Sequence, residues 1–457
     1  MRFYGREEEL RKLSEIREQS LVSSTFTMVT GRRRIGKTSL MMRSVEGTRH
    51  LYLFVSKVSE PVLCSRMQDE AESAGIPIIG KITEFRDLFK ALMIYSRTEP
   101  LTVIIDEFQD LHYVDRSIFG AIQEIWDTHY TDSHMNLIVG GSVHSLMIKL
   151  FEDSNEPLFG RATSKIVLRP FTVEMMRRIL SDHDPDAGAD DLLTLYMLTG
   201  GVPKYVGTLM DSGSTRKATM LDSALSTGSI FLRDGKDIMA TDFGKNHSTY
   251  HSIMGLIASG KNQRSEIDSI LGMDTGAYLK RLDEENQYIR QRSPMFSAKG
   301  SRNNRWEISD MYLRFYFRHI EPNSGYLESG RYDLLRRKVM SDIPTYEGKV
   351  LEALLTKMIM EEWTYTDIGS YWNRKGDVEI DIIVLDRLDH HATVIEVKRD
   401  QSRFDERGLE WKVSTIAHEL KGFDVTLRGM SREDIWTSVK HTSTEALAEN
   451  HSSHPKN

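Results

Sequence analysis

The sequence predicts a multidomain protein that begins with an α/β core built on a parallel sheet and ends in a second, smaller α/β domain. Three observations support this fold. Apolar runs alternate with amphipathic helical segments over residues 1–171, the pattern is helical over residues 172–240, and two strands of alternating polarity follow near the C-terminus. Since 457 residues exceed the size of one ordinary core, about three domains are expected.

Composition narrows the class of protein. Apolar residues make up 39% of the chain and charged residues 28%, as in soluble globular proteins, and the net charge of −7 argues against a surface that binds polyanions throughout. The longest apolar runs, such as Leu101 to Ile105, are too short to span a membrane, and the first residues lack a signal-peptide core. We therefore expect a cytoplasmic protein with no membrane partner. The single cysteine, Cys64, excludes an intrachain disulfide and a cysteine-based zinc site.

The first elements are a helix, a strand and a glycine-rich loop. Residues 6–17 carry apolar side chains at helical spacing, and residues 25–29 form an apolar, β-branched run. Residues 31–38 then have the form G-x-x-x-x-G-K-[ST], and a helical pattern starts at Ser39. Strand, loop and helix in this order are the context that a phosphate-binding loop requires, although a glycine-rich turn can match the motif by chance.

Each part of this loop has an expected role. The glycines let backbone N–H groups approach phosphate oxygens, Lys37 reaches the β- and γ-phosphates, and the Thr38 hydroxyl binds Mg²⁺. The three consecutive arginines have no role that the motif explains; they can meet phosphates, acidic partners or DNA, and solvated loop residues are the default. The predicted nucleotide-binding residues of the loop are Gly31, Arg32, Arg33, Arg34, Ile35, Gly36, Lys37, Thr38 and Ser39.

A second motif strengthens the first. After a strand at residues 50–55 and helices at 61–73 and 83–96, the apolar strand 101–105 ends in Asp106 and Glu107. This is the Walker B pattern of P-loop NTPases, in which the first carboxylate holds Mg²⁺ and the second polarises the attacking water as general base. A strand end capped by two solvated acids is the alternative for this segment alone.

Two further residues can complete the catalytic set. Strand 135–141 delivers Ser142 at its C-terminal end, the position of the sensor 1 residue in AAA-like ATPases, although Ser142 can equally be the N-cap of the helix that follows. Arg161 lies in a loop from which a cation can reach a γ-phosphate in cis or in trans. A solvated surface arginine is the alternative for Arg161.

Several segments together resemble one known family. Residues 3–10, 31–38, 104–109, 157–161 and 200–205 resemble the archaeal-type ATPases, which belong to the AAA-like/STAND P-loop NTPases and commonly end in a nuclease-like domain. The resemblance implies that ATP and Mg²⁺ are the cofactors, that Tyr4 and Arg6 border the adenine, and that Pro203 lies in a helical lid near the nucleotide. From the residues alone, Pro203 is simply in the first turn of a helix that follows a glycine C-cap.

The middle of the chain predicts a lid over residues 172–240 and a winged helix over 245–325. In the second segment, three short helices precede two strands at 288–292 and 305–308. Residues 245–320 contain 12 Lys and Arg against 8 Asp and Glu, a charge of +4 that favours contact with DNA phosphates. Acidic residues 283–285 on the candidate recognition helix oppose this, so a purely structural or regulatory winged helix is the alternative. The expected DNA contacts are Lys280, Arg281, Lys299, Arg302 and Arg305.

The last domain, at residues 340–430, carries the spacing D-x14-E-x-K in Asp381, Glu396 and Lys398. This is the spacing of PD-(D/E)xK nucleases, in which the two carboxylates hold Mg²⁺ at a phosphate and the ammonium positions the attacking water. Polar residues on half-exposed strands produce the same pattern without a function. Residues 346–348, 369–372, 379–381 and 396–398 resemble the terminal domain of the family, which implies a restriction-endonuclease-like fold with Glu347 as an additional acid.

These patterns together favour one function and leave one alternative. The favoured hypothesis is an ATP-hydrolysing switch coupled to DNA binding and Mg²⁺-dependent DNA cleavage, with a homo-oligomer as a possible state. The alternative is a nucleotide-regulated DNA-binding or scaffold protein whose nuclease-like domain does not cut. The polar tail at 442–457 is expected to be disordered, and His451 and His454 within it are expected to be solvated.

Overall fold

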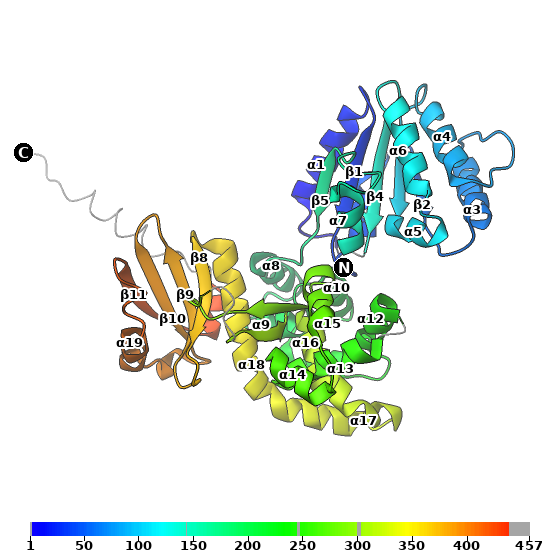
Figure 1. Cartoon of the computed structure of the whole chain (residues 1–457). Coiled ribbons are helices and arrows are strands. Elements are labelled where there is room, and N and C mark those ends of the chain that lie inside the picture. The colour runs from blue at the N-terminus through cyan, green and yellow to red at the C-terminus, as the bar shows by residue number, and fades with distance from the viewer. Residues whose placement is uncertain (1, 143, 245–246, 299–302, 438–457) are drawn as a thin grey trace, which may run out of the picture.

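The computed structural model describes residues 2–142, 144–244, 247–298 and 303–437. Figure 1 shows an N-terminal sheet covered by helices, a helical body beside it, and a second sheet at the far side of that body. The predicted disordered tail at 442–457 and the predicted DNA contacts Lys299 and Arg302 lie outside the described residues. No helix of the described segments is both long and apolar enough to cross a membrane.

The N-terminal sheet is parallel, and its strands are in the order β2-β3-β4-β1-β5. β1 lies between β4 and β5, so that Thr27 pairs with Ile138 on one side and with Ser164 on the other. The three central strands β1, β3 and β4 are buried along their full lengths, which explains their continuous apolar runs. This confirms the predicted parallel α/β core. The strands are β1 (Thr25–Thr30), β2 (His50–Phe54), β3 (Leu101–Asp106), β4 (Met135–Gly141) and β5 (Ser164–Val167).

Helices cover both faces of this sheet. On one face, Leu13 of α1 and Leu40 of α2 pack with Val29, Ile104 and Ile138. A larger core on the other face joins α3, α4, α6 and α7 to the strands. Both faces of the sheet are therefore buried by helices. The helices are α1 (Glu7–Gln19), α2 (Lys37–Ser44), α3 (Glu60–Ser73), α4 (Phe85–Tyr95), α5 (Leu111–Val114), α6 (Ile118–His129) and α7 (His144–Glu152).

The middle of the chain is helical, with one short hairpin. Five helices fill the region predicted as a lid, and three helices and an antiparallel hairpin follow in the order that the sequence predicts. The first group is α8 (Val173–His183), α9 (Ala189–Thr199), α10 (Pro203–Asp211), α11 (Lys217–Ala224) and α12 (Asp234–Phe243). The second group is α13 (His247–Ala258), α14 (Arg264–Leu271), α15 (Gly276–Lys280), β6 (Ile289–Arg292) and β7 (Arg305–Ile308). A π-helical turn (Arg281–Glu285) extends α15.

A long helix spans the domain boundary that the sequence predicts near residue 340. After α16 (Met311–Phe315) and α17 (Ser324–Glu328), helix α18 (Tyr332–Glu362) runs without interruption through Pro344. A proline inside a helix costs about 3 kcal/mol because it removes one backbone hydrogen bond. Buried side chains on both sides of it, including Leu335, Val339, Val350 and Leu354, offset that cost.

The C-terminal sheet has the strand order β11-β10-β9-β8, and only the β10–β11 pair is parallel. α18 covers one face through Ile382, Val384 and Ile395, which belong to the same apolar core as the helical body. A separate core with α19 lies on the other face. The regions predicted as lid, winged helix and terminal domain therefore share one continuous core. The elements are β8 (Asp367–Trp372), β9 (Glu379–Asp386), β10 (His391–Val397), α19 (Glu406–Ser414) and β11 (Asp424–Met430).

Candidate functional site

The phosphate-binding loop connects the end of β1 to the start of α2, and the backbone geometry explains why two of its positions are glycine. Gly36 adopts φ 89° as the residue before α2, a conformation that residues with a Cβ rarely adopt. Gly31 has φ 145°, and a Cβ there would lie 2.7 Å from the carbonyl oxygen of Leu168. The loop thus turns sharply against β5 and presents the first N–H groups of α2, the arrangement that binds phosphate.

Lys37 lies inside this loop. Its Nζ donates to the carbonyl oxygens of Gly31 at 2.9 Å and Arg32 at 3.1 Å. Only 6% of the residue is exposed, and burial lowers the pKa of Lys37 to about 8. The ammonium is therefore held by weak neutral acceptors in a desolvated position, where an anionic phosphate is a stronger partner.

Thr38 and Asp106 meet at the end of β3. The Thr38 hydroxyl donates to Oδ2 of Asp106 at 2.5 Å, and the Tyr52 hydroxyl of β2 donates to the same oxygen at 3.1 Å. A hydroxyl and a carboxylate side by side, next to Lys37, are the hard oxygen ligands that Mg²⁺ prefers, so the predicted metal ligands fit that ion. Tyr52 was missed by the sequence analysis, although its place near the end of the neighbouring strand could have indicated it.

Glu107 is held by two side chains. Ser142 donates to its Oε1 at 2.6 Å and Gln109 donates to its Oε2 at 2.7 Å. Burial alone raises the pKa of Glu107, but these hydrogen bonds and the attraction of Lys37 outweigh burial and lower the pKa below its ordinary value. The carboxylate is therefore ionised at neutral pH, as a general base requires. Ser142 thus contacts the predicted base; the sequence analysis missed Gln109.

The three arginines of the loop are half-buried and paired with acids, whereas solvated loop residues were the default expectation. Arg32 pairs with Asp310 at the start of α16, Arg33 pairs with Asp242 of α12 at 2.9 Å, and Arg34 pairs with Asp234 of the same helix. The carboxylate side chains are buried, with exposed fractions of 1%, 6% and 3% in that order. We call this set of three ion pairs the arginine clamp.

Hydrogen bonds fix the acids of the arginine clamp. Asp310 is the N-cap of α16 and accepts from the backbone N of Leu313 at 3.0 Å. The hydroxyls of Tyr205 and Tyr288 donate to Asp234 and Asp242 respectively. Burial raises the pKa of both tyrosines, and the neighbouring carboxylate raises each further, so both remain proton donors. All three acids lie about 200 or more positions beyond the loop, so no local pattern indicated them.

The remaining residues expected at the nucleotide lie around the loop. Arg6 donates to the carbonyl oxygens of Ile35 at 3.4 Å and Arg169 at 2.7 Å, so the N-terminal segment braces the loop. Pro203 is the first residue of α10, and the next backbone N–H, at position 204, donates to the carbonyl of Arg34 at 3.3 Å. Tyr4 is buried in the core of the helical body beside α8, so contact of Tyr4 with adenine stays a prediction.

Arg161 is not brought to the loop. Its Nη2 lies 3.0 Å from Oδ2 of Asp127 on α6, and its Nη1 donates to the carbonyl of Phe159 at 2.7 Å. The side chain is 28% exposed. Within one chain these contacts match the surface arginine that was the alternative, and a role for Arg161 in trans stays a prediction.

A second cluster forms at the C-terminal sheet. Asp381 Oδ2 accepts from the backbone N of Val397 at 2.7 Å, while Glu396 accepts from Lys398 at 2.7 Å and from Lys412 of α19 at 2.8 Å. The predicted triad Asp381, Glu396 and Lys398 is therefore close together, and Lys412 is an additional cation that the sequence analysis missed. Burial raises the pKa of Asp381 to about 7, and the charges of nearby carboxylates add to the rise.

Two acids of α18 lie near this cluster, and the role predicted for Glu347 stays a prediction. Glu347 is buried against Lys217 and Arg399, which neutralise it. Glu352, more than one turn further along α18, is the helix acid whose charge acts on Asp381. Glu347 is buried whereas Glu352 is partly exposed beside Arg292, and helical spacing alone could not decide which of them acts on Asp381.

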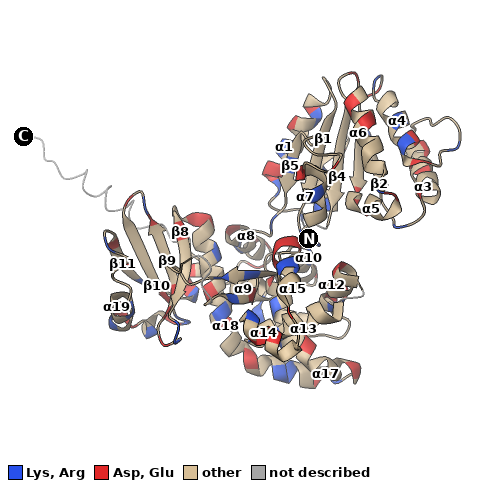
Figure 2. Ribbon diagram, in the orientation of Figure 1, with Lys and Arg blue, Asp and Glu red and all other residues tan. Residues whose placement is uncertain are grey.

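The cations expected to contact DNA have internal partners. Lys280 and Arg281 pair with acids one turn ahead, at 3.7 Å and 3.2 Å, and Arg281 also lies over the ring of Phe243. Arg305 lies over the ring of Trp372 in β8, with 4.6 Å between its guanidinium carbon and the ring centre. Arg305 therefore faces the C-terminal sheet. Figure 2 shows that positive and negative side chains are interspersed along the helices of the helical body.

Comparison with known proteins identifies the first half of the chain. Residues 3–209 match a family described as an ATPase domain predominantly from Archaea. Residues 316–409 match a family of archaeal and bacterial proteins of unknown function. An uncharacterized protein of Methanocaldococcus jannaschii is 29% identical over 406 residues, which is 87% of each chain.

One solved structure supports the fold, and a second shows a weaker similarity. A Walker-type ATPase of Pyrococcus abyssi aligns with 69% of this chain and 96% of its own, at 19% identity and a TM-score of 0.51. The ORC2 protein of Aeropyrum pernix, solved as ADPNP–ADP complexes, aligns with 74% of this chain and 96% of its own, at 16% identity and a TM-score of 0.49. With the matched domain and the loop geometry described above, the chain is an ATPase.

Two substitutions test the roles of Lys37 and Glu107. Lys37→Ala should abolish ATP binding and turnover because it removes the cation that meets the phosphates. Glu107→Gln should keep ATP binding but lower turnover by roughly 10²- to 10⁴-fold, the usual contribution of a general base. Phosphate release and nucleotide binding are measured, with Glu99→Gln at an exposed surface acid as the control. Turnover that survives either change would show that the role is misassigned.

The depressed pKa of Lys37 predicts how ATP affinity depends on pH. The ammonium is charged below pH 8 and loses its proton as the pH rises through about 8, so the apparent Kd for ATP should increase above that pH, by up to about tenfold per pH unit. Lys37→Arg keeps its charge, and its Kd should be flat over the same range. A fluorescent ATP analogue titrated between about pH 6.5 and 9.5 measures this. A wild-type Kd that does not change with pH contradicts the prediction.

Proposed function

We propose that this ATPase is a nucleotide-controlled switch in which the state of the phosphate-binding loop determines how firmly the ATPase core is attached to the C-terminal half, and that the C-terminal half acts on DNA. The arginine clamp is the observation that carries the proposal. It joins three consecutive residues of the nucleotide loop to α12 and α16, which lie in the helical body.

The clamp supports a switch because phosphate and carboxylate compete for the same donors. A guanidinium binds either group through two parallel hydrogen bonds, and these charge-assisted bonds are stronger than neutral ones. A triphosphate in the loop brings several negative oxygens close to arginines that carboxylates now hold. The nucleotide therefore has a differential interaction with the attached and released states, which is the condition for shifting their populations.

The energetics require a replacement partner. Breaking a buried ion pair by removing one partner costs about 3–5 kcal/mol, because a charge is left buried and unpaired. The clamp therefore does not open spontaneously to a large extent. A phosphate that takes over one arginine removes much of this cost, so ATP binding and its hydrolysis can change the attachment.

The proposed action on DNA rests on two arrangements. Three helices followed by an antiparallel hairpin, over residues 247–308, have the order of a winged helix. Helix α18, three antiparallel strands, α19 and a last parallel strand have the order expected of the nuclease-like domain, and Asp381, Glu396 and Lys398 lie together in it. We propose that ATP and DNA are the ligands of one device, with Mg²⁺ at Thr38 and Asp106.

Whether the C-terminal cluster cuts DNA is the point at which two candidates differ. The carboxylates near Asp381 repel one another, and a divalent cation would relieve that repulsion and support cleavage. Lys398 and Lys412 instead both pair with Glu396, a carboxylate that a metal ion would need as a ligand. This favours a domain that binds DNA without cutting it. In the described chain, no group of three acidic, histidine or cysteine side chains forms a metal site.

Disrupting the arginine clamp tests the switch. Asp310→Asn removes the charge that pairs with Arg32 but keeps a side chain that can cap α16. Asp242→Asn removes the charge that pairs with Arg33. In the wild type, ATP should increase the hydrogen exchange of backbone amides in α12 and α16. In the double variant, this exchange should already be high without ATP, and the basal rate of ATP turnover should rise several-fold. Asp237→Asn, an exposed acid on α12, is the control. Identical exchange with and without ATP in the wild type would refute the switch.

Cleavage assays separate the two candidates for the terminal domain. With Mg²⁺, the wild type should cut DNA, and Asp381→Asn or Lys398→Ala should lower the rate at least about 100-fold because each removes a ligand or the cation at the phosphate. Single-stranded, duplex and branched DNA are tested with and without ATP, with Asp389→Asn in the β9–β10 turn as the control. If the wild type cuts none of them, the non-cutting alternative holds.

A further inference from the structure

We propose that a cavity between the β6–β7 hairpin, α16, α18 and β8 binds a phosphate group of a ligand about the size of a nucleotide. The cavity has a volume of about 490 Å³ and lies where the helical body meets the C-terminal sheet. No role was assigned to it by the sequence analysis or by the proposed function. Its chemistry is set by an excess of positive side chains.

Six cations and three carboxylates line the cavity, and most of them neutralise one another. Glu307 pairs with Arg290 and with Arg292, the latter at 3.1 Å; Glu352 pairs with Arg292 at 3.4 Å, and Glu379 pairs with Arg305 at 3.6 Å. Arg318 is held from outside the cavity by Asp342 at 2.7 Å. The cations left over are Arg314 and Lys349, for which no carboxylate of the described chain lies within ion-pair distance, although the charge of Arg314 helps to lower the pKa of Glu307.

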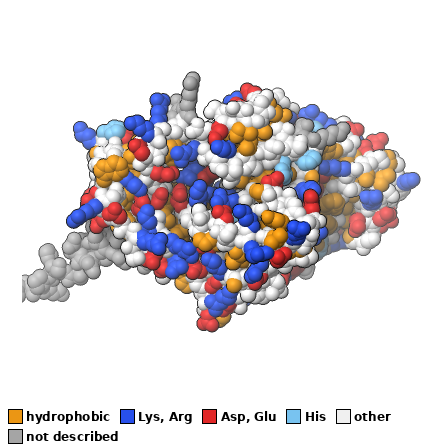
Figure 3. Space-filling view, turned by 90° about the horizontal axis from the view of Figure 1, so that it is seen from below, with side chains coloured by type: hydrophobic (Ala, Val, Ile, Leu, Met, Phe, Trp, Pro, Cys, Tyr) orange, Lys and Arg blue, Asp and Glu red, His pale blue; other side chains and the backbone are white. Residues whose placement is uncertain are grey.

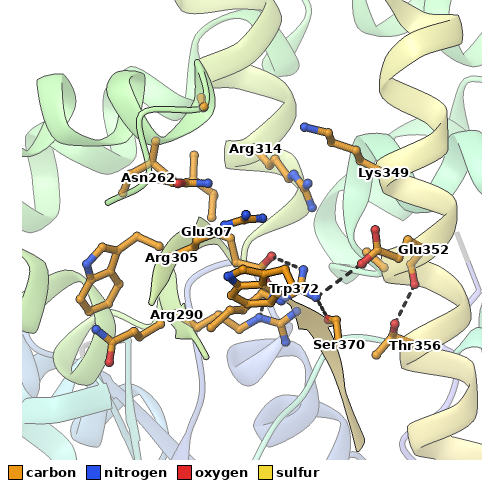
Figure 4. A pocket seen from close by; sticks show the side chains of 18 of the residues that line it. Asn262, Arg290, Arg305, Glu307, Arg314, Lys349, Glu352, Thr356, Ser370 and Trp372 are labelled. Carbon is orange, nitrogen blue, oxygen red and sulfur yellow. Dashed lines mark hydrogen bonds and ion pairs between the residues drawn. The ribbon is translucent and has the colours of Figure 1, made fainter. Parts of the chain in front are cut away.

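Arg314 comes from α16 and Lys349 from α18, and Figure 4 shows both side chains extending into the space between these two helices. Two cations that extend into the same space repel, and an anion placed between them removes that repulsion. A phosphate suits this position because a guanidinium can bind two of its oxygens while an ammonium supplies a mobile third donor. Lys349 is exposed and can move to the ligand; Arg314 is half-buried.

A tryptophan fixes the other wall. The guanidinium carbons of Arg305 and Arg292 lie 4.6 Å and 5.8 Å from the centre of the Trp372 ring. The indole N–H of Trp372 donates to the carbonyl oxygen of Asn303 at 3.2 Å. The guanidinium groups are therefore held in place before any ligand arrives, which lowers the entropy cost of binding. Figure 3 shows positive side chains close together, with acidic ones among them, on the face seen from below.

The cavity is close to the carboxylate cluster of the C-terminal sheet. Glu352 lines the cavity and its charge acts on Asp381, so a phosphate held by Arg314 and Lys349 lies near that cluster. The phosphate can belong to a DNA strand or to a free phosphate compound, which share the same recognition chemistry. That the phosphate belongs to DNA rests on the proposed function, whereas the existence of a phosphate site does not.

The test uses the full chain and the variants Arg314→Gln, Lys349→Gln and both together. Fluorescence anisotropy measures the affinity for a labelled duplex DNA at several salt concentrations. Each substitution should weaken binding on the order of 10-fold and lower the slope of log K against log salt by about 1, because one phosphate contact is lost. Arg337→Gln, an exposed arginine on α18, is the control that should change neither quantity.

Calorimetry with inorganic phosphate distinguishes the source of the ligand. If the wild type binds phosphate and the double variant does not, while DNA is bound equally by both or by neither, the cavity serves free phosphate compounds and the site stands without the DNA role. If neither DNA affinity nor phosphate affinity differs between the wild type and the double variant, the inference is overturned. DNA binding that is strong and equal in all variants leaves the proposed function intact, because DNA then binds elsewhere.

Discussion

The attachment of the nucleotide loop to the helical body depends on three buried carboxylates that each hold one arginine of that loop. Neither group could be buried alone, because an unpaired charge in the interior costs several kcal/mol. Arg34 also has a left-handed backbone conformation, with φ 66°, which is uncommon for a residue with a side chain and is stable only where its surroundings hold it. The ATPase core and the helical body are therefore interdependent: the loop gives the acids their counter-ions, and the acids keep the loop in place without nucleotide.

Local sequence was sufficient to predict the ATPase core. Strand, loop and helix follow one another around Lys37, and the placement of Asp106 beside Thr38 follows from the parallel order of β1, β3 and β4. The arginine partners could not be predicted in this way, because contacts between residues hundreds of positions apart leave no periodic trace. The terminal domain was predicted to start near residue 340, but α18 continues through Pro344, where the burial of apolar side chains before and after it outweighs the cost of the missing N–H.

The C-terminal half shows a similar division. The spacing predicted a cluster of Asp381, Glu396 and Lys398; in the structure Asp381 accepts from the backbone of Val397, and Lys398 donates to Glu396. It could not show that Lys412 reaches Glu396 from α19, or that Glu352 rather than Glu347 acts on Asp381, because several phases of a helix satisfy the same pattern. Arg305 was expected to contact DNA from the wing loop, and within the chain it lies over the ring of Trp372. Composition correctly predicted that this region is positively charged, but tertiary packing determines which way its charged side chains point.

Helix α18 has a mechanical consequence. Its 31 residues make a rod of roughly 46 Å at 1.5 Å per residue, with one end packed in the helical body and the other across the C-terminal sheet. A tilt of about 5° at one end displaces the other by about 4 Å, a distance comparable to a hydrogen bond. Pro344 lies between the two ends, where a missing backbone hydrogen bond makes bending easiest. α18 is thus a single element that ties the helical body to the C-terminal sheet, and its last turn is held to α8 by the ion pair of Glu362 with Arg177.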